Sequence, residues 1–114
     1  MAPKRSIEEI QSLIRDVHDF PKPGIVFKDI TPMLQDGPAF AACIEHMAER
    51  APKDVQLIAG PEARGFLFGP SLAHRLGCGF VPIRKPGKLP FDITSVTYEL
   101  EYLSTRNLVE NLIF

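Results

Sequence analysis

Apolar positions in the first part of the chain follow helical spacing. Ser6, with Glu9 three residues later, has the pattern of a helix capping box. Apolar residues then recur every three or four positions, at Ile7, Ile10, Leu13, Ile14 and Val17. We therefore expect a helix that begins near Ser6 and ends before the turn-forming segment DFPKPG, residues 19–24.

The next two segments are expected to differ in conformation. IVFKDITPML, residues 25–34, follows two prolines and a glycine and suits an extended segment or an ordered loop. A second helix is predicted over about 38–51, because its apolar residues share one face: Phe40, Cys43, Ile44 and Met47.

The segment from 55 to 85 predicts a strand, a helix and a second strand. VQLIAG (55–60) and CGFVPIRK (78–85) have strand character, and RGFLFGPSLAHRLG (64–77) reads as a helix closed by Gly77. Such connections are nearly always right-handed and join parallel strands. The loops that follow the two strands are therefore expected at the same edge of the sheet.

Charge is distributed unevenly around this unit. The chain has 114 residues, 45% hydrophobic content and a net charge of -1, as expected of one soluble domain, so recognition of an anion has to be local. Residues 63–91 contain no aspartate or glutamate. Their basic residues are Arg64, Arg75, Arg84, Lys85 and Lys88.

Four of these basic residues follow the two predicted strands. Parallel geometry would gather Arg64 with Arg84, Lys85 and Lys88 at one edge, where the start of the helix adds free N–H groups. This arrangement predicts a site for phosphate or pyrophosphate. The alternative is ordinary solvated surface charge, and the absence of nearby acids favours the anion site.

Other classes of site and location have little support in the sequence. Cys43 and Cys78 lack metal-ligand spacing, so we expect them to pack as small apolar side chains. The segment KPGKLP lacks the interleaved aromatic residues and overall basicity of a nucleic-acid contact. No apolar run suits a membrane span or a secretion signal, so we expect a cytoplasmic protein with no membrane partner.

Four segments together resemble the adenine phosphoribosyltransferases, which have the type I phosphoribosyltransferase fold. They are FPKPGIVFKDITPML (20–34), GPEARGFLFGPSLAHRLG (60–77), IRKPGKLP (83–90) and YELEY (98–102). They occur in the family's order and spacing over roughly residues 5–102, and the combination is much more specific than any one segment. The resemblance implies an α/β fold built on a parallel sheet.

The resemblance also implies an activity and its site. Members of this family act in purine salvage: they join adenine to phosphoribosyl pyrophosphate, giving AMP and pyrophosphate with Mg²⁺ assisting, and they form homodimers. Phe27 would stack on adenine, and backbone groups of Val26 and Lys28 would hydrogen-bond its edge. The alternative for Phe27 is a core aromatic residue beside a turn.

By the same resemblance, the basic residues would bind pyrophosphate. Arg64 would hold it, next to a cis peptide between Glu62 and Ala63, and further contacts would come from Arg84, Lys85 and Lys88. These cations would stabilise the charge that develops on the leaving group.

The segment of about 91–102 resembles the family's mobile lid, and its alternating residues suit a β-hairpin arm. Within it, Glu101 and Tyr102 correspond to the catalytic loop residues that assist the base and cover the site. Their alternative is solvent-facing strand residues.

The end of the chain departs from the family pattern. The acidic and Gly-rich motif D-D-x-x-A-T-G-G-T, which holds the ribose phosphate in the family, does not occur in these 114 residues. We therefore divide the chain into residues 1–102, the N-terminal part of a phosphoribosyltransferase domain with an incomplete sheet, and an out-of-family tail, residues 103–114.

Alternatives remain open for the tail and for function. LVENLIF, residues 108–114, has helical spacing and could pack as a replacement helix, although we favour a tail from a truncated or altered reading frame. The alternative to the family activity is a non-catalytic fragment that binds purine or pyrophosphate or pairs with another subunit.

Overall fold

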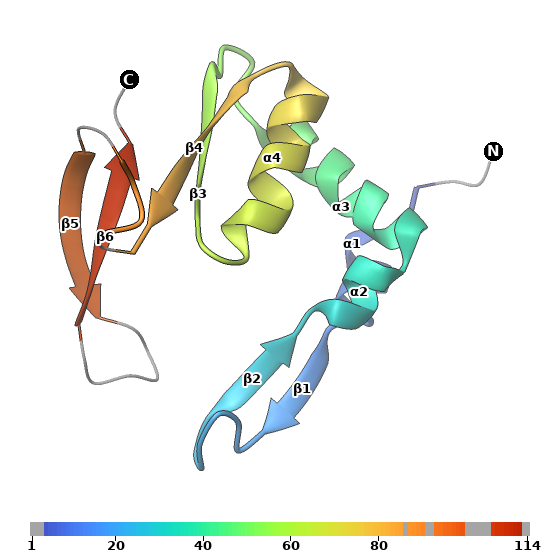
Figure 1. Cartoon of the computed structure of the whole chain (residues 1–114). Coiled ribbons are helices and arrows are strands. Elements are labelled where there is room, and N and C mark those ends of the chain that lie inside the picture. The colour runs from blue at the N-terminus through green and yellow to red at the C-terminus, as the bar shows by residue number, and fades with distance from the viewer. Residues whose placement is uncertain (1–3, 86, 91–92, 100–105, 113–114) are drawn as a thin grey trace. The chain divides into compact units, whose positions relative to one another are not determined.

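The computed structural model describes residues 4–85, 87–90, 93–99 and 106–112 (Figure 1). The chain divides into two compact units, Met1–Ala51 and Pro52–Phe114. Within the described ranges, no helix has the length and apolar character needed to cross a membrane.

The first unit packs three helices together. They are α1 (Ile7–Gln11), α2 (Thr31–Gln35) and α3 (Gly37–Arg50), and both α1 and α2 pack against α3. The predicted capping box starts α1: the Glu9 N–H donates to Ser6 Oγ at 3.1 Å, and the Ser6 N–H donates to Glu9 Oε1 at 3.0 Å. The buried side chains of this unit are Ile10, Met33, Ala39, Ala42 and Ile44.

The predicted first helix is wrong beyond Gln11. Arg15–His18 forms β1, which pairs antiparallel with β2, Val26–Asp29, so that Val17 lies opposite Phe27. Two cross-strand ion pairs, Arg15 with Asp29 and Asp16 with Lys28, accompany this hairpin. Pairing with residues about a dozen positions away thus overrides the local helical spacing. The segment predicted as extended or loop becomes β2 followed by α2.

The second unit contains the predicted parallel strands. β3 (Leu57–Pro61) pairs parallel with β4 (Gly79–Arg84), in a register from Leu57↔Gly79 to Pro61↔Ile83. The connection is α4 (Gly65–Leu76), which packs on both strands. As predicted, Gly77 ends this helix: its φ of 72° is the left-handed conformation that glycine adopts without a Cβ clash.

Close packing at the start of α4 depends on glycine. A Cβ on Gly65 would lie 2.6 Å from Pro61 Cδ and 2.7 Å from the carbonyl carbon of Gly60. A Cβ on Gly60 would lie 2.8 Å from the Gly65 carbonyl oxygen. The end of β3 and the first residue of α4 therefore touch through backbone atoms, which places the β3–α4 turn directly against the strand.

Two further strands extend the second sheet, whose order in the described residues is β3-β4-β6-β5. β5 (Ile93–Glu99) and β6 (Arg106–Leu112) pair antiparallel over seven residues each, and β6 also pairs with Ile83 and Arg84 of β4. The lid segment, expected to form a hairpin arm, contributes the single strand β5, and the antiparallel partner of that strand, β6, comes from the tail. The alternative of a helix in the tail is wrong, since 106–112 gains a strand partner on each side.

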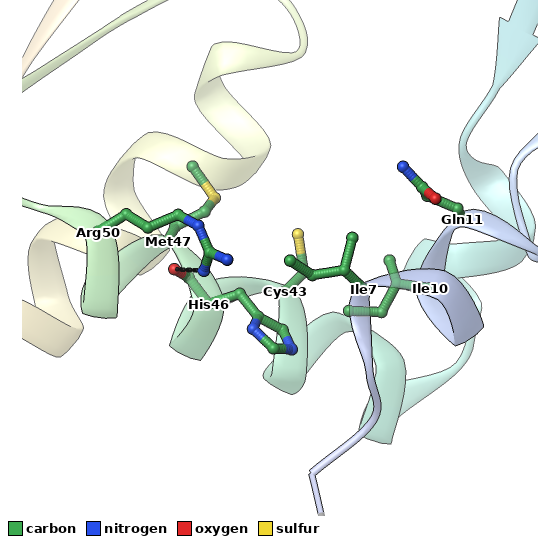
Figure 2. Close-up of a pocket in the computed structure, with 7 residues that line it drawn as sticks. All are labelled: Ile7, Ile10, Gln11, Cys43, His46, Met47 and Arg50. Carbon is green, nitrogen blue, oxygen red and sulfur yellow. Dashed lines mark hydrogen bonds between the residues drawn. The ribbon is translucent and has the colours of Figure 1, made fainter.

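A hollow of about 220 Å³ lies between α1 and α3 in the first unit (Figure 2). Its lining residues turn mainly apolar surface toward the hollow, and burial raises the pKa of the Cys43 thiol within it. Cys43 and Cys78 are both free and half-buried, in keeping with the expected packing role. The hollow is lined by Ile7, Ile10, Gln11, Cys43, His46, Met47 and Arg50.

Candidate active site

The carboxyl ends of β3 and β4 lie side by side, as the sequence predicts. The register pairs Pro61 with Ile83, and the ladder continues one residue further, because the Glu62 N–H donates to the Ile83 carbonyl at 3.0 Å. Arg84 is the last residue of β4, and Arg64 immediately precedes the first residue of α4. The peptide bond between Glu62 and Ala63 is cis, which confirms the expectation from the family resemblance.

A carboxylate joins the two strand ends. Glu62 Oε1 accepts a hydrogen bond of 2.6 Å from the backbone N–H of Lys85, and Glu62 Oε2 accepts one of 3.4 Å from Arg84 Nη2. The Lys85 N–H, followed by the Arg84 guanidinium, lowers the pKa of the Glu62 carboxyl. Glu62 is therefore ionised at neutral pH and links the β3–α4 turn to the segment that follows β4.

This link corrects one premise of the sequence argument. Because residues 63–91 contain no acid, we expected their basic residues to have no carboxylate neighbour. Glu62, one position outside that range, nevertheless pairs with Arg84. The pairing is invisible in a local window because the two residues are 22 positions apart. Sequence reasoning missed Glu62 as a component of the site. The parallel register was the signal that could have found it.

The start of α4 also differs from expectation. The N–H groups of Phe66 and Leu67 are not free, because they donate to the carbonyls of Ala63 and Arg64, each at 3.0 Å. The first turn is thus tightened by bonds to the third residue back. The helix dipole still places its positive end beside the strand ends, but these two N–H groups are already used within the chain.

The Arg84 side chain is held between two neighbours. Its guanidinium carbon lies 5.7 Å from the centroid of the Phe66 ring, a cation–π contact. Phe66 in turn meets Phe80 edge to face, with ring centroids 6.0 Å apart. Within the described part of the chain, Arg84 Nε is buried and has no hydrogen-bond partner.

The lysines of the predicted site follow β4 in an exposed turn. The Lys88 N–H donates to the Lys85 carbonyl at 3.3 Å, and Gly87 has the positive φ of 79° that such a turn favours. Lys85 and Lys88 are both exposed. The turn brings their backbones together at the end of β4, so the structure gathers Arg84, Lys85 and Lys88 on one short segment.

The predicted adenine-binding residues all lie on β2, in the first unit. The Phe27 ring meets the Phe20 ring edge to face, with centroids 5.2 Å apart and an interplanar angle of 71°. Phe20 is half exposed and Phe27 is partly exposed, so this aromatic pair is not part of a buried core. Phe27 thus differs from the alternative of a core aromatic residue.

Val26 and Lys28 lie two positions apart on the same strand. In an antiparallel pair, the backbone groups of alternate residues point to the same edge, so those of Val26 and Lys28 share a direction that differs from that of Phe27. The Lys28 ammonium lies 2.5 Å from Asp16 Oδ1. The ammonium is therefore engaged across the hairpin, and the predicted role of Lys28 rests on its backbone.

Asp29 fastens the end of β2. Its carboxylate accepts hydrogen bonds from the Arg15 guanidinium and from the N–H and hydroxyl of Thr31, at 3.0 and 2.7 Å. These contacts, with Arg15 the largest cause, lower the pKa of Asp29 to about 2. Sequence reasoning did not identify this network, because Arg15 was assigned to a helix.

Two predicted catalytic residues, Glu101 and Tyr102, lie outside the residues that the structure describes. Within the described part, no group of three or more His, Cys, Asp or Glu side chains has the arrangement of a metal site.

Comparison with known proteins gives consistent matches. The chain is 59% identical over 98 residues to the adenine phosphoribosyltransferase of Thermoanaerobacter sp. (strain X514), a match that covers 85% of this chain and 57% of that protein. The crystal structure of adenine phosphoribosyltransferase from Thermoanaerobacter pseudethanolicus is 56% identical, with a TM-score of 0.83 over 92% of this chain and 60% of the other. No protein-family model matches the sequence.

A more distant structure has a similar backbone. The adenine phosphoribosyltransferase of Giardia lamblia, solved in complex with 9-deazaadenine, is 37% identical, with a TM-score of 0.86 over 94% of this chain and 59% of the other. The chain thus spans 57% to 60% of the length of these three relatives.

The parallel β3–α4–β4 unit, its basic strand ends and these superpositions define an α/β protein of the phosphoribosyltransferase class. Within that class, the matched residues belong to the adenine phosphoribosyltransferase family.

Proposed function

We propose that this chain serves purine salvage with its family's activity, the transfer of the phosphoribosyl group from phosphoribosyl pyrophosphate to adenine, giving AMP and pyrophosphate, although the family's ribose-phosphate motif does not occur in these 114 residues. The observation that carries the proposal is the 59% identity to an adenine phosphoribosyltransferase over the residues that form both predicted binding segments. The solved Giardia lamblia relative in complex with 9-deazaadenine supports a purine as the substrate base.

Pyrophosphate is proposed to bind at the end of the parallel strands. Arg64 would hold the anion from the start of α4, and Arg84, Lys85 and Lys88 would contact it from the segment after β4. Cations at this position favour departure of the leaving group, because negative charge grows on the pyrophosphate as its bond to the ribose breaks. The Arg84 side chain is 34% exposed at the end of β4, which supports its role as a contact for an anion.

Adenine is proposed to bind against β2. The ring of Phe27 would stack on the purine, while backbone groups of Val26 and Lys28 would hydrogen-bond its edge. The common direction of those backbone groups supports this role, as does the aromatic pair on the partly exposed hairpin. The lid, residues 91–102, would close over the bound substrates, with Glu101 assisting the base and Tyr102 covering the site.

Further features of the proposal come from the family resemblance. Mg²⁺ is proposed to enter with the substrate, held through its phosphate oxygens. We also propose that the chain forms a homodimer and acts in the cytoplasm.

The direct test is AMP formation by the full 114-residue chain given adenine, phosphoribosyl pyrophosphate and Mg²⁺. We expect Arg64→Ala to weaken pyrophosphate binding about tenfold to a hundredfold, as for loss of a charged hydrogen-bond donor. Lys53→Ala is the matched control, because Lys53 is an exposed cation that precedes β3 at its opposite end.

The outcomes separate the proposed activity from its alternative. AMP formation by the unaltered chain that is strongly reduced in Arg64→Ala and unchanged in Lys53→Ala would support the enzyme. Binding of adenine or pyrophosphate without AMP formation would favour the non-catalytic binding module. An absence of both binding and turnover would contradict the proposed function.

A further inference from the structure

Glu62 connects the ends of the two parallel strands through both its backbone and its side chain. The Glu62 N–H extends the ladder by donating to the Ile83 carbonyl, and its carboxylate reaches past Ile83 to the next two residues. The end of β4 is thus tied to Glu62 at three successive positions. A surface ion pair with only one side-chain contact would not fix the strand end in this way.

The two carboxylate oxygens of Glu62 accept hydrogen bonds from different groups. Oε1 takes the backbone N–H of Lys85 at 2.6 Å, which fixes the direction of the chain as it leaves β4. Oε2 takes one N–H of the Arg84 guanidinium at 3.4 Å. A guanidinium has five N–H donors, so this contact orients Arg84 while engaging only a small part of its donor capacity.

The ring of Phe66 supplies a second support for the same guanidinium. Arg84 lies over this ring, with 5.7 Å between the guanidinium carbon and the ring centroid. A side chain as long as arginine loses much rotational freedom when it is held. Because Glu62 and Phe66 both restrict Arg84 before any ligand arrives, a ligand that binds this guanidinium pays less of that ordering cost.

We propose that Glu62 is a positioning residue for pyrophosphate: its carboxylate sets the guanidinium of Arg84 and the backbone at Lys85 in the arrangement that receives the anion. This inference rests on the proposed function. Glu62 makes no contact with pyrophosphate itself and acts through its two neighbours. Positioning by Glu62 favours pyrophosphate binding, whereas repulsion between its carboxylate and the bound anion opposes it. A substitution that removes the charge distinguishes the two effects: it weakens binding if positioning dominates and strengthens binding if repulsion dominates.

The test measures binding of Mg²⁺-pyrophosphate to the full chain by calorimetry near neutral pH. We expect Glu62→Ala to weaken binding about tenfold, the usual effect of losing one oriented hydrogen-bonding group. Glu62→Gln should retain part of the affinity, because its amide oxygen can still accept the Lys85 N–H. Asp54→Ala is the control: Asp54 is an exposed acid of the same unit, so its removal should leave binding unchanged.

A second measurement does not depend on the ligand. Hydrogen exchange of the Lys85 amide should be faster in Glu62→Ala than in the unaltered chain, and intermediate in Glu62→Gln. A chain that binds no pyrophosphate but has a protected Lys85 amide would contradict the proposed function and leave the link itself intact. An amide unaffected by Glu62→Ala would refute the link whether or not pyrophosphate binds.

Unchanged or tighter pyrophosphate binding by a folded Glu62→Ala variant would overturn the positioning role. Circular dichroism separates this result from unfolding. If Glu62→Ala fails to fold, Glu62→Gln is the deciding variant. Pyrophosphate binding equal to that of the unaltered chain, together with unchanged exchange of the Lys85 amide, would show that the charge of Glu62 does not position Arg84 and Lys85. Glu62 would then have only a role in folding. Weaker binding with a native spectrum would support the positioning role.

Discussion

Replacement of Gly65 by alanine should destabilise the second unit, although alanine is the better helix former. The new Cβ would lie 2.6 Å from Pro61 Cδ, 2.7 Å from the Gly60 carbonyl carbon and 2.9 Å from Gly60 Cα. These are atoms of the main chain and of a proline ring, which cannot rotate away as a flexible side chain can. The β3–α4 turn would have to move.

The magnitude follows from two opposing effects. Forcing an extra methyl group into a packed site costs about 1–3 kcal/mol. Replacing glycine by alanine in a helix returns up to about 1 kcal/mol, and less at the first residue. We therefore expect Gly65→Ala to lower the free energy of unfolding by about 1–2 kcal/mol.

Gly37 provides a matched control, because it too is the first residue of a helix, α3. A Cβ on Gly37 meets nothing within 4 Å. Gly37→Ala should therefore leave stability unchanged or raise it by about 0.4–1 kcal/mol, through the reduced freedom of the unfolded chain.

The assay is urea unfolding followed by far-ultraviolet circular dichroism, with the slope of the transition compared among the three proteins. With equal slopes, the midpoint should fall for Gly65→Ala and stay or rise for Gly37→Ala. A Gly65→Ala variant as stable as the unaltered chain would refute the reasoning, since it would mean that the strand end and the helix start separate at little cost.

Two further predictions concern the first unit. Phe27→Ala should weaken adenine binding by roughly 1–3 kcal/mol, the range for loss of one aromatic stacking partner, whereas Phe27→Tyr should retain most of the affinity. Calorimetry with adenine measures both variants. An affinity of Phe27→Ala equal to that of the unaltered chain would exclude the stacking role. The Asp29 carboxyl has a folded-state pKa of about 2, below its ordinary value of 3.8, so its contribution to stability is complete above pH 3.8 and is lost as pH falls toward 2. Nuclear magnetic resonance titration of the Asp29 carboxyl should give this low midpoint, and Arg15→Ala should raise it; a midpoint near 3.8 in the unaltered chain would contradict the network.

The parts of the fold that sequence reasoning predicted correctly are those with local signals. The capping box at Ser6, the glycine that ends α4 and the two strands around that helix are each specified within a few residues. The parallel pairing then followed from the handedness of the connection. The placement of Arg64 and Arg84 beside the two strand ends followed from that pairing.

The parts that it missed depend on contacts distant along the chain. β1 contains Val17, the last of the apolar residues at helical spacing, but the cross-strand partners of its Arg15 and Asp16 are Asp29 and Lys28. Glu62 was missed for the same reason, since its partners lie more than 20 positions later. A local sequence pattern does not identify such distant side-chain pairs. They can be recognised only when the pairing register of the strands is known.

The separation of 23 positions between Glu62 and Lys85 has a consequence for insertions and deletions. One residue added within α4 would rotate everything after it by about 100° around the helix axis. β4 would then have to slip by one position against β3 or strain the turn at Gly77, and a slip would point Arg84 to the opposite face of the sheet. The length of this segment, and not only its composition, is therefore a requirement of the site, and engineered variants should accept substitutions on the exposed side of α4 far more readily than a change in its residue count.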